Sequence, residues 1–199
     1  MPVHDDVATH PRWSELRQYV NDLAFLDGGS DEAFTLASGR SSRWFFDTKP
    51  VMMHPDAGQI VGMLINLRAK SLGVSFVGGL ELGAVPLTAL VIATASKDSN
   101  LRGFMVRKEP KGRGGRKTQN PPGFEGFSMA TGGSVLLVED VTTTGGSAIK
   151  AIERIHAETN CKVVCVISIL DREEGAQEAF EAAGIPFESL LLRSHITDQ

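Results

Sequence analysis

Two adjacent acids, Glu139 and Asp140, lie between an apolar run and a loop rich in hydroxyls and glycines. The run Val135–Val138 predicts a strand that is buried on both faces, and the pattern near Ala148–Ala157 predicts a helix after the loop. A helix N-terminus offers free N–H groups and partial positive charge, so the loop Thr142–Ser147 suits a phosphate. Acids at the carboxyl end of the strand suit a ligand that also carries hydroxyls. The segment therefore predicts a site for a ribose phosphate.

A plainer interpretation of the same segment is a buried strand, a surface turn and a capped helix, because acids near a helix start are favourable in any protein. The sequence gives little support to a P-loop or to a dinucleotide-binding site. The chain has no G-x-x-x-x-G-K-[ST] string, and its nearest G-x-G-like string, at Gly112–Gly115, lies in a basic segment rather than after a strand.

A second candidate for chemistry is the basic, glycine-rich segment Arg107–Lys117. It carries six basic residues against one acid, Glu109. Its glycines and Pro110 disfavour regular structure, and the segment through Gly126 is long enough for a mobile lid. Cations aimed at a polyanionic leaving group such as pyrophosphate stabilise the charge that builds as the bond breaks. A solvated loop and an RNA contact remain the alternatives, although aromatic residues only flank the segment.

The chain as a whole has the composition of a globular protein. It has 199 residues, of which 42% are hydrophobic and 22% charged, and this length fits a single domain. A net charge of -4 argues against general nucleic-acid binding. The two cysteines, Cys161 and Cys165, are expected to be buried free thiols of a cytoplasmic protein. Neither a secretory signal nor an apolar run long enough to span a membrane is evident.

Strand patterns alternate with helix patterns along most of the chain. This rhythm predicts a parallel sheet with helices on both faces. The residues before about 49, including a helical pattern over 13–26, do not follow this alternation of strands and helices. They are expected to form a small hood over the sheet's carboxyl edge. The expected strands are 74–79, 101–108, 135–141, 163–171 and 190–193, and the expected helices of the core are 55–71, 84–95, 148–157 and 173–183.

Five strings in a fixed order carry a family resemblance. The string with the two acids resembles the phosphoribosyl-diphosphate (PRPP) motif of type I phosphoribosyltransferases. The F-T-L-x-S-G-R and R-K-E-x-K patterns narrow the resemblance to the orotate phosphoribosyltransferase family. The strings are FTLASGRSSRWFF at 34–46, VGGLELGAVP at 77–86, VRKEPK at 106–111, VEDVTTTGGSA at 138–148 and LDREEGAQEA at 170–179.

The resemblance implies a fold, a reaction and an assembly. The fold would be one domain, with a hood over about 1–49 and an α/β core over about 50–199 built on a five-stranded parallel sheet. The reaction would be transfer of the phosphoribosyl group of PRPP to orotate, giving orotidine 5′-monophosphate and pyrophosphate in de novo pyrimidine (UMP) synthesis. Mg²⁺ would be bound mainly through PRPP, with no dedicated protein metal site. The assembly would be a homodimer in which each basic loop reaches the neighbour's site.

The resemblance also implies residue roles. The acid pair would hold the ribose hydroxyls, the following loop the 5′-phosphate, and the basic segment the pyrophosphate, while an arginine would pair with orotate's carboxylate beside two aromatic rings. The implied catalytic residues are Lys108, Lys111, Glu139 and Asp140. The implied PRPP contacts are Arg107, Lys108, Lys111, Arg113, Glu139, Asp140, Val141, Thr142, Thr143, Thr144, Gly145, Gly146 and Ser147. The implied orotate contacts are Phe45, Phe46, Thr143 and Arg172.

Three positions depart from the family pattern. Many members carry lysine where this chain has Ala37 and Gly83, and a histidine is common where it has Arg113. These changes remove two cations near the substrates and leave two alternatives open. One is the same chemistry on another base, and the other is a non-catalytic regulator that senses PRPP.

Overall fold

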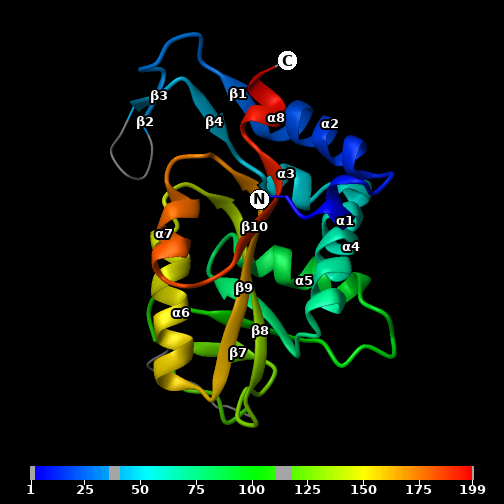
Figure 1. Cartoon of the computed structure of the whole chain (residues 1–199), viewed down its shortest axis with the longest axis vertical. Helices are drawn as coiled ribbons and strands as arrows, with labels where there is room; N and C mark the ends of the chain where they lie inside the picture. The colour runs from blue at the N-terminus through cyan, green and yellow to red at the C-terminus, as the bar shows by residue number, and fades with distance from the viewer. Residues whose placement is uncertain (1–2, 36–40, 111–117, 199) are drawn as a thin grey trace.

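The computed structural model describes residues 3–35, 41–110 and 118–198. Its centre is a six-stranded sheet with the order β10-β9-β8-β5-β6-β7 (Figure 1). Five of these strands are parallel, which confirms the predicted parallel core, and β7 adds an antiparallel edge that the sequence did not indicate. The strands are β5 (Phe76–Leu80), β6 (Arg102–Val106), β7 (Phe124–Gly126), β8 (Gly133–Thr142), β9 (Cys161–Asp171) and β10 (Phe187–Leu192).

The order of the strands reverses between β5 and β8. From β5 the chain moves outward to β6 and then returns to the other side of β5 as β8. In open α/β sheets the crevice at such a reversal, outside the carboxyl ends of the strands, is where ligands bind. The carboxyl ends of β5 and β8 are therefore the place where this topology positions a site.

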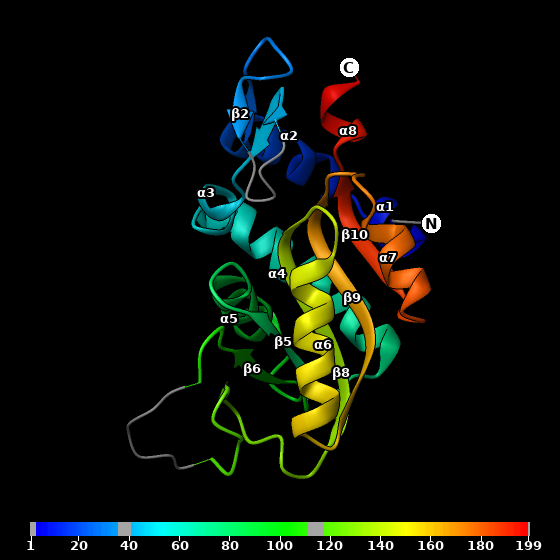
Figure 2. The same ribbon diagram turned by 90° about the vertical axis from the view of Figure 1, so that its left-hand side faces the viewer.

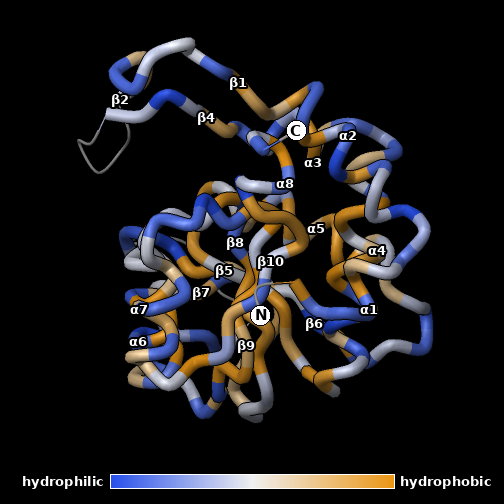
Figure 3. Tube along the Cα trace, turned by 45° about the horizontal axis from the view of Figure 1, so that its top comes forward, coloured by the Kyte–Doolittle hydropathy of each residue, from blue (hydrophilic) through white to orange (hydrophobic). Residues whose placement is uncertain are grey.

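Alternate residues of β8 face opposite layers of the molecule. Leu136 and Val138 belong to an apolar cluster with α4 (Pro55–Leu72) and α5 (Ala84–Thr94). Val135 and Leu137 face a second cluster, with α6 (Gly146–Glu158) and α7 (Ala176–Ala182). Figures 1 and 2 show these helix pairs on the two sides of the sheet, and Figure 3 shows apolar residues concentrated along the central strands. Burial on both faces explains why the strand reads as a continuous apolar run.

The helices begin and end largely where local chemistry indicates. Proline is favoured in the first turn of a helix, and α4 starts at Pro55, with the His54 imidazole accepting the Ala57 N–H at 3.3 Å. The helix ends at Gly73, whose φ of 60° is a left-handed conformation that glycine adopts without a steric penalty. The predicted helix over 55–71 is thus confirmed.

The N-terminal part forms the expected hood, and it shares its core with the sheet. Leu16 and Val20 of α2 join the same apolar cluster as Val77 of β5, and the Trp13 indole N–H donates to the Leu190 carbonyl at 2.8 Å. Strands β1 and β4 pair antiparallel, as do β2 and β3. The remaining elements are α1 (Asp5–Ala8), α2 (Trp13–Ala24), β1 (Phe25–Asp27), β2 (Phe34–Thr35), β3 (Ser41–Ser42), β4 (Trp44–Phe46), α3 (Lys49–Met52) and α8 (Ser194–Thr197).

Both cysteines are buried and free, as predicted. Burial raises the pKa of Cys165 to about 12, so its thiol stays protonated at neutral pH. Among the residues that the structure describes, no helix is long and apolar enough to span a bilayer.

Candidate active site

The acid pair lies at the carboxyl end of β8, where the strand order reverses. The Glu139 side chain is buried, with 9% of the residue exposed, and its Oε1 receives no hydrogen bond from any described residue. Burial, with the Asp140 charge beside it, raises the pKa of Glu139 to about 8, while Lys108 acts in the opposite sense. A buried carboxyl group without a partner is costly, which is the expected condition of a group whose partner is a ligand.

A small cavity of about 100 Å³ opens beside Glu139, between the end of β8 and the start of α6. Gly145, at φ 76°, precedes the helix and offers no side chain to accept the first-turn N–H groups. Thr142 Oγ1, at the cavity wall, is buried and has no partner among the described residues. An anion in the cavity would meet these N–H groups and the positive end of the helix. The lining residues are Glu139, Val141, Thr142, Thr143, Thr144, Gly145, Gly146, Ser147 and Ala148.

The loop that follows β5 lies against the acid pair. A Cβ atom at Gly83 would overlap the carboxyl group of Asp140, so Asp140 occupies the space where a side chain at position 83 would begin. Glycine at position 83 therefore leaves room for this position of the Asp140 carboxyl group. Lys49, at the start of α3, is held by Asp47 at 2.8 Å, and the Asp140 charge contributes to raising its pKa, so a hood cation acts on the acid pair.

The basic segment begins at the end of β6. The Arg107 guanidinium pairs with Glu125 of β7 at 3.0 Å. The Lys108 N–H donates to Glu81 Oε1 at 2.8 Å, and its ammonium group acts on the charge of Glu139. Lys111 and Arg113, which the sequence also predicts as PRPP contacts, lie outside the described residues, as does Ala37.

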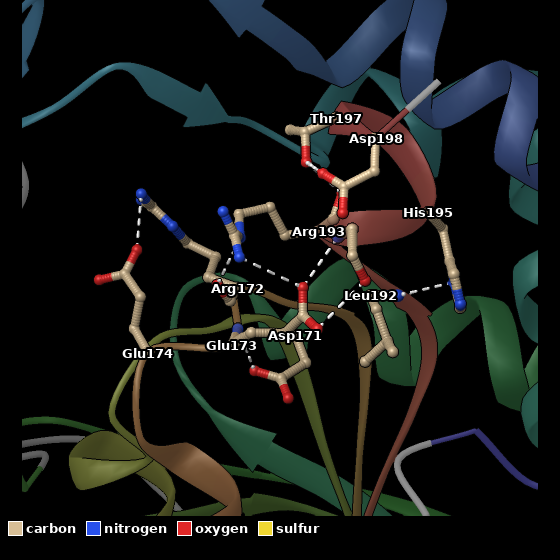
Figure 4. A network of polar contacts seen from close by, with 10 residues as sticks. Asp171, Arg172, Glu173, Glu174, Leu192, Arg193, His195, Thr197 and Asp198 are labelled. Carbon is tan, nitrogen blue, oxygen red and sulfur yellow. Dashed lines mark hydrogen bonds and ion pairs between the residues drawn. The ribbon is translucent and has the colours of Figure 1, made fainter. Parts of the chain in front are cut away.

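Arg172, just after β9, joins the core to the hood. Its guanidinium Nη2 donates to Ser42 Oγ at 3.0 Å and to the Trp44 carbonyl at 3.3 Å. The same nitrogen forms an ion pair with Glu174 at 2.8 Å, and the Arg172 side chain is only 6% exposed. Figure 4 shows this ion pair beside the polar network around Asp171 and Arg193. Because this buried guanidinium pairs with the carboxylate of Glu174, it can pair in the same way with the carboxylate of a planar, acidic ligand.

The two predicted aromatic contacts point to opposite sides of β4, as successive strand residues must. Phe46 is 6% exposed and packs on Phe25 with ring centroids 5.1 Å apart. Phe45 is 36% exposed and lies 5.7 Å from Phe34. Phe46 therefore belongs to the hood's core, and Phe45 is the ring of the pair that a ligand can reach.

The structure thus brings the acid pair, the phosphate loop, the β5 loop and Lys108 to one edge of the sheet. Such a site can hold a terminal phosphate at the N-terminus of α6, sugar hydroxyls at the two acids, and a second anionic group near Lys108. The sequence alone gave no role to Lys49 or Glu174, because Lys49 acts on the distant Asp140 and Glu174 acts through Arg172.

Comparisons with known proteins agree with this geometry. No protein-family model matches the chain. The orotate phosphoribosyltransferase of Rhodopseudomonas palustris (strain TIE-1) is 45% identical over 161 residues, which are 80% of this chain and 84% of that protein. The enzyme of the same name from Rhodopirellula baltica is 38% identical over 165 residues, covering 79% of this chain and 81% of that protein.

Solved structures give the same result. Mycobacterium tuberculosis orotate phosphoribosyltransferase in complex with Fe(III) dicitrate superposes with a TM-score of 0.79 at 30% identity, covering 94% of this chain and 99% of that chain. The structure of the same enzyme in complex with PRPP superposes with a TM-score of 0.74, at the same identity and coverage.

Proposed function

This chain belongs to the orotate phosphoribosyltransferase family, and we propose that it binds PRPP in the cavity between β8 and α6. The enzyme transfers the phosphoribosyl group of PRPP to orotate, giving orotidine 5′-monophosphate and pyrophosphate in pyrimidine biosynthesis. The observation that carries the binding site is the buried Oε1 of Glu139, which has no hydrogen-bond partner in the described part of the chain and lies at the wall of a phosphate-sized cavity. The PRPP complex of the M. tuberculosis enzyme, which has this fold, supports the assignment.

The proposed mechanism is a displacement at C1 of the ribose. The bond from C1 to the pyrophosphate oxygen breaks, and the pyrophosphate leaves with the electron pair. An orotate ring nitrogen forms the new bond to C1 and gives up its proton to the solvent or to the departing pyrophosphate. The N–H groups at the start of α6 hold the 5′-phosphate. Asp140, together with Glu139 in its ionised form, accepts the ribose hydroxyls and favours the positive charge that develops on the sugar. Lys108 stabilises the negative charge that builds on the leaving group.

Mg²⁺ is proposed to enter with PRPP. The described residues contain no cluster of three or more His, Cys, Asp or Glu side chains that could hold a metal ion. Mg²⁺ commonly uses one or two carboxylates together with substrate phosphates and water, and the oxygens of Glu139 and Asp140 at the cavity edge fit that donor set. When bound, the ion supplies charge neutralisation on the pyrophosphate oxygens.

The experiment that tests the function follows the absorbance of orotate. With the protein, PRPP and Mg²⁺ present, the orotate absorbance should fall, and the fall should depend on all three components. Parallel reactions with adenine and with uracil serve as controls for base specificity. Turnover of either control base without turnover of orotate would overturn the assignment of orotate as substrate.

Arg172 is proposed to hold the carboxylate of orotate. Glu174 pairs with this guanidinium at 2.8 Å, so orotate would compete with the Glu174 carboxylate for it. Arg172→Ala should therefore raise the KM for orotate at least about tenfold, the loss expected for a charge-assisted pair, with little change in the KM for PRPP. Glu174→Gln, which weakens the competing carboxylate, should lower the KM for orotate. Steady-state kinetics with each substrate varied in turn measure both effects, and an unchanged orotate KM in Arg172→Ala would remove Arg172 from the base site.

The active form is proposed to be a homodimer. Helix α5 is apolar on all sides, and such helices are normally buried, yet its Val85, Ala89 and Ile92 line an exposed apolar groove of about 440 Å³ together with Phe127. The groove lies beside β6, the strand from which the basic segment leaves, so a second copy seated there would be close to that segment. Light scattering should give twice the 21.4 kDa mass of the chain. Ile92→Asp places a charge in the groove, so the measured mass should fall to that of one chain. A wild-type protein that scatters as one chain would refute the proposal.

A cytoplasmic location is proposed as well. The two buried free thiols are typical of a reducing compartment.

A further inference from the structure

The peptide bond between Arg107 and Lys108 is held at both of its polar atoms by charged side chains from other elements. The Arg107 carbonyl accepts a hydrogen bond from Arg154 Nη1 of α6 at 2.6 Å. On the other side, the Lys108 N–H donates to the carboxylate of Glu81, in the loop after β5, at 2.8 Å. Both bonds are charge-assisted, which makes them stronger than neutral hydrogen bonds.

Arg154 is itself fixed in place. Its guanidinium lies over the ring of Phe124 with 5.5 Å to the centroid, and its Nε pairs with Glu158 at 3.0 Å. The guanidinium also fills the space above Gly123, where any Cβ atom would overlap it. Arg154 therefore contacts both chain segments at the base of the basic segment, one at the Arg107 carbonyl and the other at Gly123. The two segments are also joined directly, since the Arg107 N–H donates to the Gly123 carbonyl at 2.9 Å.

Glu81 is fixed as well. Its own N–H donates to the Val106 carbonyl at 2.8 Å, so its backbone continues the pairing of β5 with β6. Its carboxylate then reaches one peptide further, to Lys108. The peptide is thus held between two anchors, one on the β5 loop and one on the helix that begins at the phosphate cavity.

The orientation of a peptide plane sets the direction in which the next side chain leaves the backbone. Lys108 is the residue that follows this peptide, so the two anchors set the direction in which its side chain leaves the backbone. We propose that Glu81 and Arg154 are positioning residues that fix the Arg107–Lys108 peptide and so direct Lys108 toward the leaving pyrophosphate. This inference rests on the proposed role of Lys108 in the transfer reaction.

The first test replaces each anchor. Arg154→Met and Glu81→Met should each lower kcat about tenfold, while the KM for PRPP changes by less than about threefold, because a misdirected lysine affects the transition state more than the bound substrate. Arg154→Lys, which can still donate to the carbonyl, should recover part of the loss. Glu158→Gln is the matched control: its amide oxygen can still accept the Arg154 Nε–H, so it removes a charge beside Arg154 without releasing either anchor, and it should keep the wild-type kcat. Should Arg154→Met fail to fold, Glu81→Met tests the opposite side of the same peptide.

The decisive measurement repeats both substitutions in a Lys108→Ala background. If the anchors act through Lys108, each should then cost less than about twofold, because the group they direct is gone. A cost that is the same with and without Lys108 overturns the inference and makes the anchors merely structural. Failure of the proposed function has a different signature, since the wild-type protein itself would then show no transfer to orotate.

Discussion

Replacing Lys108 by alanine should lower kcat by about 100-fold or more while the Kd for PRPP changes by less than about threefold. The reason is that its ammonium group meets charge that appears on the pyrophosphate only as the bond to C1 breaks. Interactions made only in the transition state raise the rate without tightening substrate binding. Steady-state kinetics give kcat, and calorimetry with PRPP gives the Kd.

Lys162→Ala supplies the control for this experiment. Lys162 is an exposed lysine near the start of β9, so its loss changes the net charge equally without touching the site. A fall in PRPP affinity as large as the fall in kcat would show that Lys108 binds the ground state, and the assignment to the leaving group would be withdrawn.

Glu139→Gln should produce two opposite effects, a loss of activity and a gain of stability. Activity should fall about 100-fold, because an amide cannot favour positive charge on the ribose as a carboxylate does. Stability should rise because the folded-state pKa of about 8 lies above the ordinary value of 4.5. Between these two values the unfolded chain releases a proton that the folded chain retains, so the wild-type protein loses stability as pH rises from about 4.5 to about 8.

The measurement is the Tm of wild type and Glu139→Gln at pH 5 and at pH 8. The substitution should be close to neutral at pH 5 and should stabilise at pH 8 by on the order of a few kcal/mol, which is several degrees in a chain of this size. Glu153→Gln, on the exposed side of α6, is the control and should leave the pH dependence unchanged. If the Tm values of Glu139→Gln and wild type changed by the same amount between pH 5 and pH 8, this result would contradict the raised pKa of Glu139.

The central part of the site could be predicted from the sequence because it is continuous in the chain. The acid pair, the loop and the start of α6 are consecutive residues, and the apolar run before them fixes where the strand ends. Once the run is identified as a buried strand, the positions of Glu139 and Gly145 follow from the geometry of one strand and one helix. The parallel topology follows for a related reason, since strands alternate with helices at regular intervals.

The anchors of Lys108 could not be predicted in this way. Arg154 contacts a carbonyl 47 residues away, and Glu81 contacts an N–H 27 residues away. In the sequence, Arg154 is simply four residues before Glu158, the spacing of an ordinary surface ion pair on a helix. That pair is present at 3.0 Å, but the contact with the basic segment depends on how α6 packs against the β6–β7 edge, which no local pattern encodes.

Two features of the fold were missed for local reasons. Strand β7 has only three residues, too few for an alternating pattern to be visible. Helix α7 begins at Ala176 rather than at the expected 173, because Glu173 and Gly175 have φ values of 57° and 102°. The Glu173 carboxylate accepts the Ser194 N–H at 2.8 Å, which helps to hold this left-handed turn. Such a tertiary contact overrides the helix propensity of the glutamates at 173 and 174.

The packing of Asp140 over Gly83 has an evolutionary consequence. With the acid in this rotamer, a side chain at position 83 would overlap the Asp140 carboxyl group, so a substitution there requires that carboxyl group to turn aside. A mutation at position 83 is therefore tolerated only to the extent that the Asp140 side chain can adopt another rotamer, which couples what evolution can place at these two positions.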